Sequence, residues 1–278
     1  MNIRDIVARA LAEDLGAGDV TTQSLFPEAA PALGTIVAEE RDGLIVAGLT
    51  VAVEVFRQVD PELVCRPSFS DGDRVQAGAT IFTVTGDGRS ILKGERVALN
   101  FLQRLSGSAT LTAKFCEAVR STRARILDTR KTTPGLRELE KWAVTLGGGH
   151  NHRHSLGDGI LIKDNHLALA GGDVARACRL VRERAPHGLK IEVEVRTLDE
   201  VRAALDGGAD IILLDNMDVP SIRKAVELIK GRAIIEVSGG VSLTTVRDIA
   251  LAGPDFISIG ALTHSAPAAG FSMDIVRR

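Results

Sequence analysis

The spacing of apolar residues divides the chain into two regions with different patterns. A helical pattern over residues 3–15 is followed, between residues 35 and 90, by short β-rich runs separated by glycine and aspartate turns. A helix-like run interrupts these strands at residues 49–58. Residues 93–120 are helical again, and we expect Gly107 to break them into two helices. The first region is therefore typical of a small α+β domain, with the domain junction near residues 93–120.

A regular alternation of strands and helices begins after residue 120. Six short aliphatic runs are each followed by a helical pattern or a turn. Such alternation predicts an α/β fold with a parallel sheet, either open or closed into a barrel. In chain order the predicted strands are ARILD, GILIK, KIEVEV, DIILLD, AIIEV and DFISIG.

Polar, charged or glycine residues follow every one of these six strands. The carboxyl ends of parallel barrel strands share one rim, and active sites lie at that rim. The sequence therefore predicts a functional site there. The residues concerned are Thr129, Arg130 and Lys131 after the first strand, Lys163 after the second, Glu194 and Asp215 at the third and fourth, and Ser238, Gly239, Gly240 and Gly260 after the last two.

Two glutamates in the third strand need an explanation. Glu192 and Glu194 share one face of the strand because alternate residues point the same way. If helices cover the aliphatic face, both carboxylates point into the barrel, where they need a cation or a hydrogen-bond donor. An edge strand with a solvated face is the alternative.

Four cations cluster between residues 130 and 163. Arg130 and Arg153 can each bind a carboxylate with two hydrogen bonds, and Lys131 and Lys163 suit phosphate or carboxylate as point charges. This chemistry fits a small ligand with several negative charges, and a solvated basic loop is the alternative. Ser238, Gly239 and Gly240, with Gly260 one unit later, match the backbone phosphate site of the last strands of a barrel.

Other chemistries have weaker support. His150, His152 and His154 alternate and suggest zinc, but no acidic or cysteine fourth ligand lies nearby in the sequence. A net charge of −2 and the absence of tyrosine argue against nucleic acid. No apolar run approaches bilayer length, and the three cysteines are widely spaced, so we expect no membrane partner and a cytoplasmic protein.

Several motifs together resemble one family. DTRKTTPGLRELEKWAV, NHR, LIKDNH, EVEV, LLDN, SGG and SIGALTHSAP occur in this order, as in the quinolinate phosphoribosyltransferases, which are type II phosphoribosyltransferases. The resemblance implies an N-terminal α+β sandwich domain (1–108) and an incomplete α/β barrel of about six or seven strands (109–278), with the C-terminal tail packed back on the first domain. It also implies Mg²⁺ and an active site at the interface of a homodimer, or of a hexamer containing such dimers.

The resemblance further implies a reaction and its residues. Quinolinate and phosphoribosyl pyrophosphate (PRPP) would give nicotinate mononucleotide, pyrophosphate and carbon dioxide, in de novo NAD synthesis. Quinolinate would meet Arg130, His152, Arg153 and Lys163, with Arg96 from the partner subunit. For PRPP, the resemblance implies that Lys131 and Lys163 face the phosphates and that Glu194 and Asp215 hold the ribose or Mg²⁺. The phosphate end would contact Ser238, Gly239, Gly240, Gly260 and His264. Thr129 also joins the predicted substrate site, and Lys131, Lys163, Glu194 and Asp215 would be catalytic.

Three alternatives stay open at this point. The first is a paralogue with another substrate, such as the homologue linked to molybdenum transport, which the intact TRKTTPGLR and NHR motifs disfavour. The second is a Schiff-base aldolase using Lys163 or Lys131, although such a lysine needs an apolar setting. The third is a non-catalytic anion-binding protein.

Overall fold

The computed structural model describes residues 2–278, which divide into two compact units. Each unit is assembled from segments that are separated in the sequence. No helix in the described residues is long and apolar enough to cross a membrane. Unit 1 comprises residues 2–113, 132–148 and 262–278, and unit 2 comprises residues 114–131 and 149–261.

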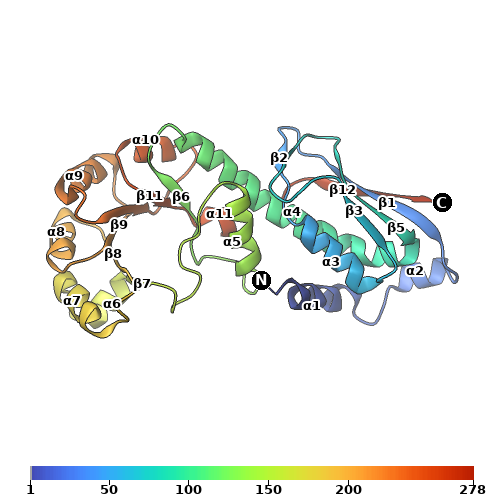
Figure 1. The fold of residues 1–278 in the computed structure, drawn as a ribbon, viewed down its shortest axis with the longest axis horizontal. Coiled ribbons are helices and arrows are strands. Elements are labelled where there is room, and N and C mark those ends of the chain that lie inside the picture. Colours follow the sequence, from blue (N-terminus) through green and yellow to red (C-terminus); the bar gives the residue numbers. More distant parts are fainter. Residues whose placement is uncertain (1) are drawn as a thin grey trace. The chain divides into compact units, whose positions relative to one another are not determined.

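Unit 1 contains a four-stranded antiparallel sheet with the order β12-β1-β5-β3 (Figure 1). Its central strand β1 alternates buried and partly exposed residues, so one face meets the core. Ile36 of β1 lies opposite Phe82 of β5 on one side and Met273 of β12 on the other. The strands are β1 (Pro31–Ala38), β3 (Val64–Pro67), β5 (Thr80–Asp87) and β12 (Phe271–Arg277), with a separate short pair, β2 (Leu44–Ile45) and β4 (Arg74–Val75).

Helices of unit 1 bury apolar faces in the same core. In α3 (Leu49–Val59), Val55 and Phe56 are fully buried, and the Phe56 ring stacks on Phe82 with 5.7 Å between ring centroids. Burial of a side chain of this size stabilises the fold by roughly 1.5–3 kcal/mol. The other helices are α1 (Ile3–Leu15), α2 (Val20–Leu25) and α5 (Arg137–Leu146).

The long helix α4 (Gly88–Val119) is continuous, so the expected break at Gly107 is wrong. A Cβ atom at Gly107 would lie only 2.0 Å from the carbonyl oxygen of Pro267. Glycine is needed there because another backbone passes close by, and its intrinsic helix-breaking tendency is overridden by packing. The helix also runs through the predicted boundary between residues 108 and 109, and that boundary stays a prediction.

Unit 2 is a six-stranded parallel sheet with the order β6-β11-β10-β9-β8-β7 (Figure 1). A parallel bridge between Leu127 and His150 adds one further pairing beside β6. All six predicted strands are present, which confirms the α/β architecture with a barrel-like C-terminal sheet. The strands are β6 (Arg125–Leu127), β7 (Ile160–Ile162), β8 (Ile191–Val195), β9 (Ile211–Asp215), β10 (Ile234–Ser238) and β11 (Phe256–Ser258).

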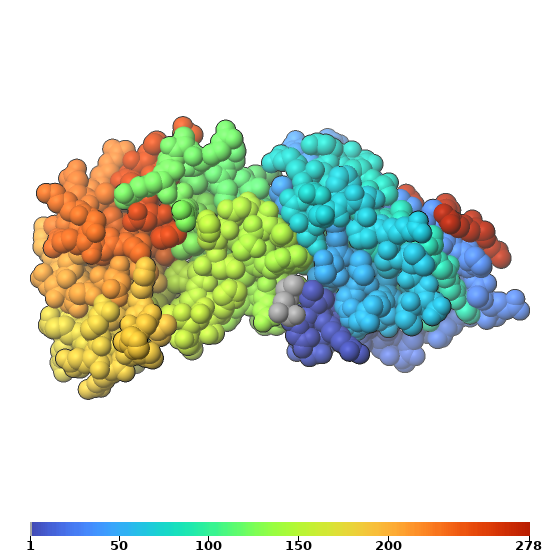
Figure 2. Space-filling model, in the orientation of Figure 1, coloured from blue at the N-terminus to red at the C-terminus, as the bar shows by residue number. Residues whose placement is uncertain are grey.

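Helices connect these strands and cover the sheet. Their starts follow local rules: Thr197 and Glu200 form a capping box at α8, and Asp218 caps α9, which has proline in its first turn. Figure 2 shows α7, α8 and α9, coloured yellow to orange, on the surface of unit 2. The helices are α6 (Asp164–Leu169), α7 (Val174–Arg184), α8 (Leu198–Asp206), α9 (Val219–Ile229) and α10 (Val246–Leu251). The short helix α11 (Ala261–His264) comes next in the chain, and its residues 262–264 belong to unit 1.

Candidate functional site

A cavity of about 390 Å³ lies at the carboxyl ends of the parallel strands of unit 2. Polar residues that follow different strands converge here because all the strands run in one direction. The predicted residues among its lining are Thr129, Arg130, Lys131, His152, Arg153, Lys163, Glu194, Asp215 and Ser238. The lining also includes Leu161, Leu213, Asn216, Glu236 and Ser258, which the sequence analysis did not assign to the site.

Two guanidinium groups dominate the positive charge of the cavity. Burial, followed by the neighbouring charge of Arg130, lowers the pKa of Arg153. Arg153 donates a hydrogen bond from Nη1 to the carbonyl oxygen of Gly159 at 2.8 Å. The Nε atom of Arg130 is buried and has no hydrogen-bond partner among the described residues. Two like charges held together with a buried unused donor favour an anionic ligand.

The negative charge comes from Glu194 and Asp215, at the ends of adjacent strands. Burial, followed by repulsion from Asp215, raises the pKa of Glu194. Lys163 offsets part of this repulsion, since its Nζ lies 3.8 Å from Oε2 of Glu194. Asn216 donates a hydrogen bond to Oδ2 of Asp215 at 2.9 Å. Carboxylate oxygens in this arrangement can accept hydroxyl donors or bind a hard divalent cation.

Lys163 is exposed and close to Glu194. A Schiff-base lysine needs an apolar setting that favours the neutral amine. An exposed lysine beside a carboxylate lacks that setting, so this geometry disfavours the aldolase alternative for Lys163.

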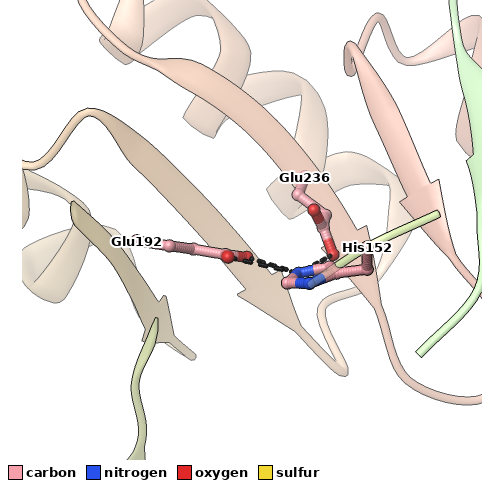
Figure 3. A group of neighbouring side chains, drawn as sticks. All are labelled: His152, Glu192 and Glu236. Atoms are coloured by element: carbon pink, nitrogen blue, oxygen red, sulfur yellow. Dashed lines mark hydrogen bonds and ion pairs between the residues drawn. The ribbon is translucent and has the colours of Figure 1, made fainter. Parts of the chain in front are cut away.

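His152 lies between the side chains of two buried glutamates, Glu192 and Glu236, as Figure 3 shows. Its Nε2 lies 3.2 Å from Oε2 of Glu192 and 3.5 Å from Oε1 of Glu236. Its Nδ1 accepts the backbone N–H of Arg153 at 2.7 Å, and its own backbone N–H donates to Asp128 at 2.8 Å. Because Nδ1 accepts a hydrogen bond, the ring proton is on Nε2 and points to the glutamates.

Glu236 belongs to this cluster and is 2% exposed. Burial, together with repulsion from Glu192, raises its pKa to about 7. A carboxyl that keeps its proton limits the negative charge buried at the cavity wall. The sequence analysis predicted that Glu192 and Glu194 point into the barrel. Their contacts agree with this orientation, because Glu192 contacts His152 and Glu194 contacts Lys163.

Ligand atoms of His152, Glu192 and Glu236 lie within 4.8 Å of one another, so a metal is conceivable on spacing alone. A metal on Nε2 would require the ring proton on Nδ1, where the backbone N–H of Arg153 already donates. The hydrogen-bonding pattern therefore favours a proton at Nε2. The zinc alternative built on alternating histidines also loses support, because His150 and His154 are exposed and stand outside this cluster.

The remaining predicted residues lie elsewhere. Gly239 and Gly240 follow β10 with φ angles of 94° and 60°, and Gly260 follows β11, but none of them lines the cavity. Arg96, on α4, and His264, on α11, are exposed residues of unit 1. The roles predicted for these five residues stay predictions.

Sequence reasoning missed Glu236, and it placed Asn216 at a strand end without giving it a role. The sequence did contain a signal for Glu236, because it is a carboxylate in an otherwise aliphatic strand. Asn216 had a weaker one, since it directly follows Asp215 at a strand end. Its positive φ of 55° and its contacts with the next strand end could not be read from the sequence.

Family models match nearly the whole chain. The N-terminal domain of quinolinate phosphoribosyl transferase matches residues 19–106, and the C-terminal domain matches residues 108–274. The chain belongs to the quinolinate phosphoribosyltransferase family.

Curated relatives and solved structures agree with this assignment. The probable nicotinate-nucleotide pyrophosphorylase [carboxylating] of Bacillus subtilis is 40% identical over 275 residues, covering 99% of this chain and 94% of that protein. The chloroplastic nicotinate-nucleotide pyrophosphorylase [carboxylating] of Arabidopsis thaliana is 43% identical over 293 residues, covering 99% and 83%. The crystal structure of NadC from Streptococcus pyogenes has a TM-score of 0.93 at 42% identity, covering 100% of this chain and 97% of that one.

Proposed function

We propose that this chain is a nicotinate-nucleotide pyrophosphorylase that transfers the phosphoribosyl group of PRPP to quinolinate. The products are nicotinate mononucleotide, pyrophosphate and carbon dioxide, and the reaction serves NAD biosynthesis. One observation carries the proposal: a single cavity combines two neighbouring, partly buried arginines with a pair of carboxylates. The arginines suit a dicarboxylate, and the carboxylates suit a ribose that develops positive charge.

Arg130 and Arg153 would bind the two carboxylates of quinolinate. The unused Nε–H of Arg130 is a preformed donor for one carboxylate oxygen. His152 would form a wall of the same pocket, and its ring orientation is fixed by Arg153, Glu192 and Glu236. A monocarboxylate such as nicotinate leaves one buried cation unpaired, so the site should discriminate strongly against it.

PRPP would occupy the rest of the cavity. Glu194 and Asp215 would accept the ribose hydroxyls, and Lys131 and Lys163 would face the pyrophosphate. The phosphate end would meet Thr129, Ser238, Gly239, Gly240, Gly260 and His264. Mg²⁺ prefers oxygen ligands, fits the carboxylates of Glu194 and Asp215, and when bound would neutralise charge on the pyrophosphate.

The chemistry then follows from charge and orientation. The pyridine nitrogen attacks the anomeric carbon, and pyrophosphate leaves with the bonding electrons through an oxocarbenium-like transition state. Glu194 and Asp215 stabilise this positive charge. The new bond makes the ring nitrogen cationic, so the ring can hold the electron pair left at C2 when carbon dioxide departs. A proton from solvent then adds at C2 and gives nicotinate mononucleotide. The two arginines hold the ring in position for both steps.

We also propose a cytoplasmic homodimer, or a hexamer containing such dimers, in which Arg96 of one protomer serves the other's cavity. Domains of residues 1–108 and 109–278 are part of this proposal. Mixing the variants Arg96→Ala and Asp215→Asn tests it, because a mixed dimer would contain one complete site. Recovery of activity on mixing two inactive variants is expected, and no recovery after subunit exchange contradicts the shared site.

The reaction is tested with purified protein, PRPP, Mg²⁺ and quinolinate labelled with ¹³C in the 2-carboxyl group. We expect labelled carbon dioxide, pyrophosphate and nicotinate mononucleotide in equal amounts, with no comparable turnover of nicotinate. Asp215→Asn should abolish turnover, while Asp206→Asn, at the exposed end of α8, should leave it unchanged. Equal use of nicotinate, or no turnover of quinolinate, contradicts the proposal.

A further inference from the structure

Arg196 directly follows β8 and bridges three carboxylates at the ends of neighbouring strands. Its Nε lies 3.2 Å from Oδ2 of Asp215, its Nη2 lies 3.6 Å from Oε1 of Glu194, and the same Nη2 lies 3.1 Å from Oδ2 of Asp164. Glu194 and Asp215 are the pair assigned above to ribose or Mg²⁺. Arg196 was not among the residues predicted for the site.

We propose that Arg196 is a positioning residue that acts as an internal counter-cation, competing with the incoming metal or ribose for the oxygens of Glu194 and Asp215. The identity of the ligand rests on the proposed function. The competition itself concerns a cation and two carboxylates, so it can be measured without the reaction.

The hydrogen bonds at Asp215 show why competition follows. Oδ2 of Asp215 already receives two donors, Nε of Arg196 at 3.2 Å and Nδ2 of Asn216 at 2.9 Å. A carboxylate oxygen offers two lone pairs. A ligand that takes this oxygen must therefore displace one of the two donors.

Arg196 is the donor that can leave. Asn216 has a positive φ of 55° and is held against Gly239, where even a Cβ atom would lie 2.3 Å from Oδ1 of Asn216. The side chain of Arg196 is 55% exposed, whereas that of Asp215 is 13% exposed. The backbone of Arg196 is fixed by a 2.7 Å hydrogen bond from its N–H to Glu200, so only the side chain needs to move.

Charge balance gives Arg196 a role both with and without ligand. The two carboxylates of Glu194 and Asp215 repel each other, and Lys163 alone approaches Glu194 only to 3.8 Å. Arg196 holds the pair together until a divalent cation replaces it. Asp164 is 53% exposed and can keep the guanidinium at the rim after displacement.

The test is a titration with Mn²⁺ alone, with free metal followed by electron paramagnetic resonance at 150 mM salt. We expect Arg196→Ala to lower the Kd for Mn²⁺ by about three- to tenfold, because the variant removes a competing donor together with a repelling charge. The matched control is Arg202→Ala, an exposed arginine paired with Asp199 on α8, which should leave the Kd unchanged. The double variant Arg196→Ala/Asp215→Asn should lose the gain.

Each other outcome overturns the proposal. An unchanged Kd, or no Mn²⁺ binding by Arg196→Ala at millimolar metal, means that the arginine does not compete for the pair. An equal effect of Arg202→Ala means that general charge is responsible, and a gain that survives Asp215→Asn places the metal elsewhere. Turnover of quinolinate is measured separately. The proposal for Arg196 can therefore be contradicted while the proposed reaction is confirmed, and the proposed reaction can be contradicted while the proposal for Arg196 is confirmed.

Discussion

Gly239 follows one strand of the parallel sheet, Asn216 follows the next, and the two are in direct contact. A Cβ atom on Gly239 would lie 2.3 Å from Oδ1 of Asn216, and the glycine φ of 94° is itself unfavourable for other residues. Asn216 in turn donates to Asp215. The glycine therefore controls the position of a cavity carboxylate that it does not touch.

Gly239→Ala should combine backbone strain with displacement of Asn216. We expect a loss of about 1–3 kcal/mol in the free energy of unfolding and at least a tenfold fall in kcat/KM. Urea denaturation and steady-state kinetics measure the two effects. Gly231→Ala is the control, because its φ is 73° but nothing lies within 4 Å of the new Cβ, so it should lose stability without losing kcat/KM. Equal kcat/KM values for the two variants would show that activity does not depend on the position of the Asn216 side chain.

The raised pKa of Glu236 predicts a pH dependence of stability. The unfolded chain loses this proton near pH 4.5, whereas the folded protein keeps it to about pH 7. The stability contributed by this group is therefore complete below pH 4.5 and is lost as pH rises to 7, by about 3 kcal/mol in total. Glu236→Gln should gain stability over the wild type across this window, with a constant difference above it. Urea denaturation at pH 5, 6, 7 and 8 measures the free energy of unfolding of both proteins. If the two plots of this free energy against pH are parallel, the pKa of Glu236 is not raised.

Arg130→Lys tests whether the partly buried guanidinium is needed for more than its charge. Lysine keeps the charge but cannot donate two parallel hydrogen bonds to a carboxylate. We expect kcat/KM for quinolinate to fall about 10²-fold or more, with a smaller change for nicotinate. The control Arg120→Lys changes an exposed arginine on the surface, 79% exposed, and should have no effect. Similar losses for both substrates would show that Arg130 does not select the dicarboxylate.

Glu140 anchors the segment of residues 132–148 within unit 1. Its carboxylate is fully buried and accepts from Nε and Nη2 of Arg104 at 3.0 and 2.8 Å, and from the N–H and hydroxyl of Thr133. Glu140→Ala leaves the arginine without its partner, which should cost about 3–5 kcal/mol in the free energy of unfolding. Glu138→Ala, on the same helix but exposed, is the comparison, and an equally small effect of both changes would contradict the anchoring role.

Local patterns were sufficient for most elements of the fold. The strands of unit 2 are short aliphatic runs with polar ends, and their direction follows from the alternation with helices. The rim residues Arg130, Arg153, Lys163, Glu194 and Asp215 could be predicted for the same reason, since parallel strands bring their carboxyl ends together.

Features that depend on contacts between distant segments could not be predicted. Gly107 looks like a helix break until Pro267 is seen to pass beside it. The proton position on His152 depends on the backbone of Arg153 and on glutamates from two other strands. Arg196 looks like an ordinary loop arginine, and only the geometry shows three carboxylates around it.

The pairing of β1 with β12 also has a consequence during synthesis of the chain. β1 lies between β12 and β5, and its partner residues 271–277 are synthesised after every other strand of the described residues. Until then β1 has one open edge, which is a site for pairing with other chains. Residues 114–131 and 149–261, which form unit 2, are made earlier and need no part of this tail for their six strands. Folding of unit 1 therefore finishes after that of unit 2, and removal of residues 271–277 should cause aggregation of nascent chains before it affects any catalytic residue.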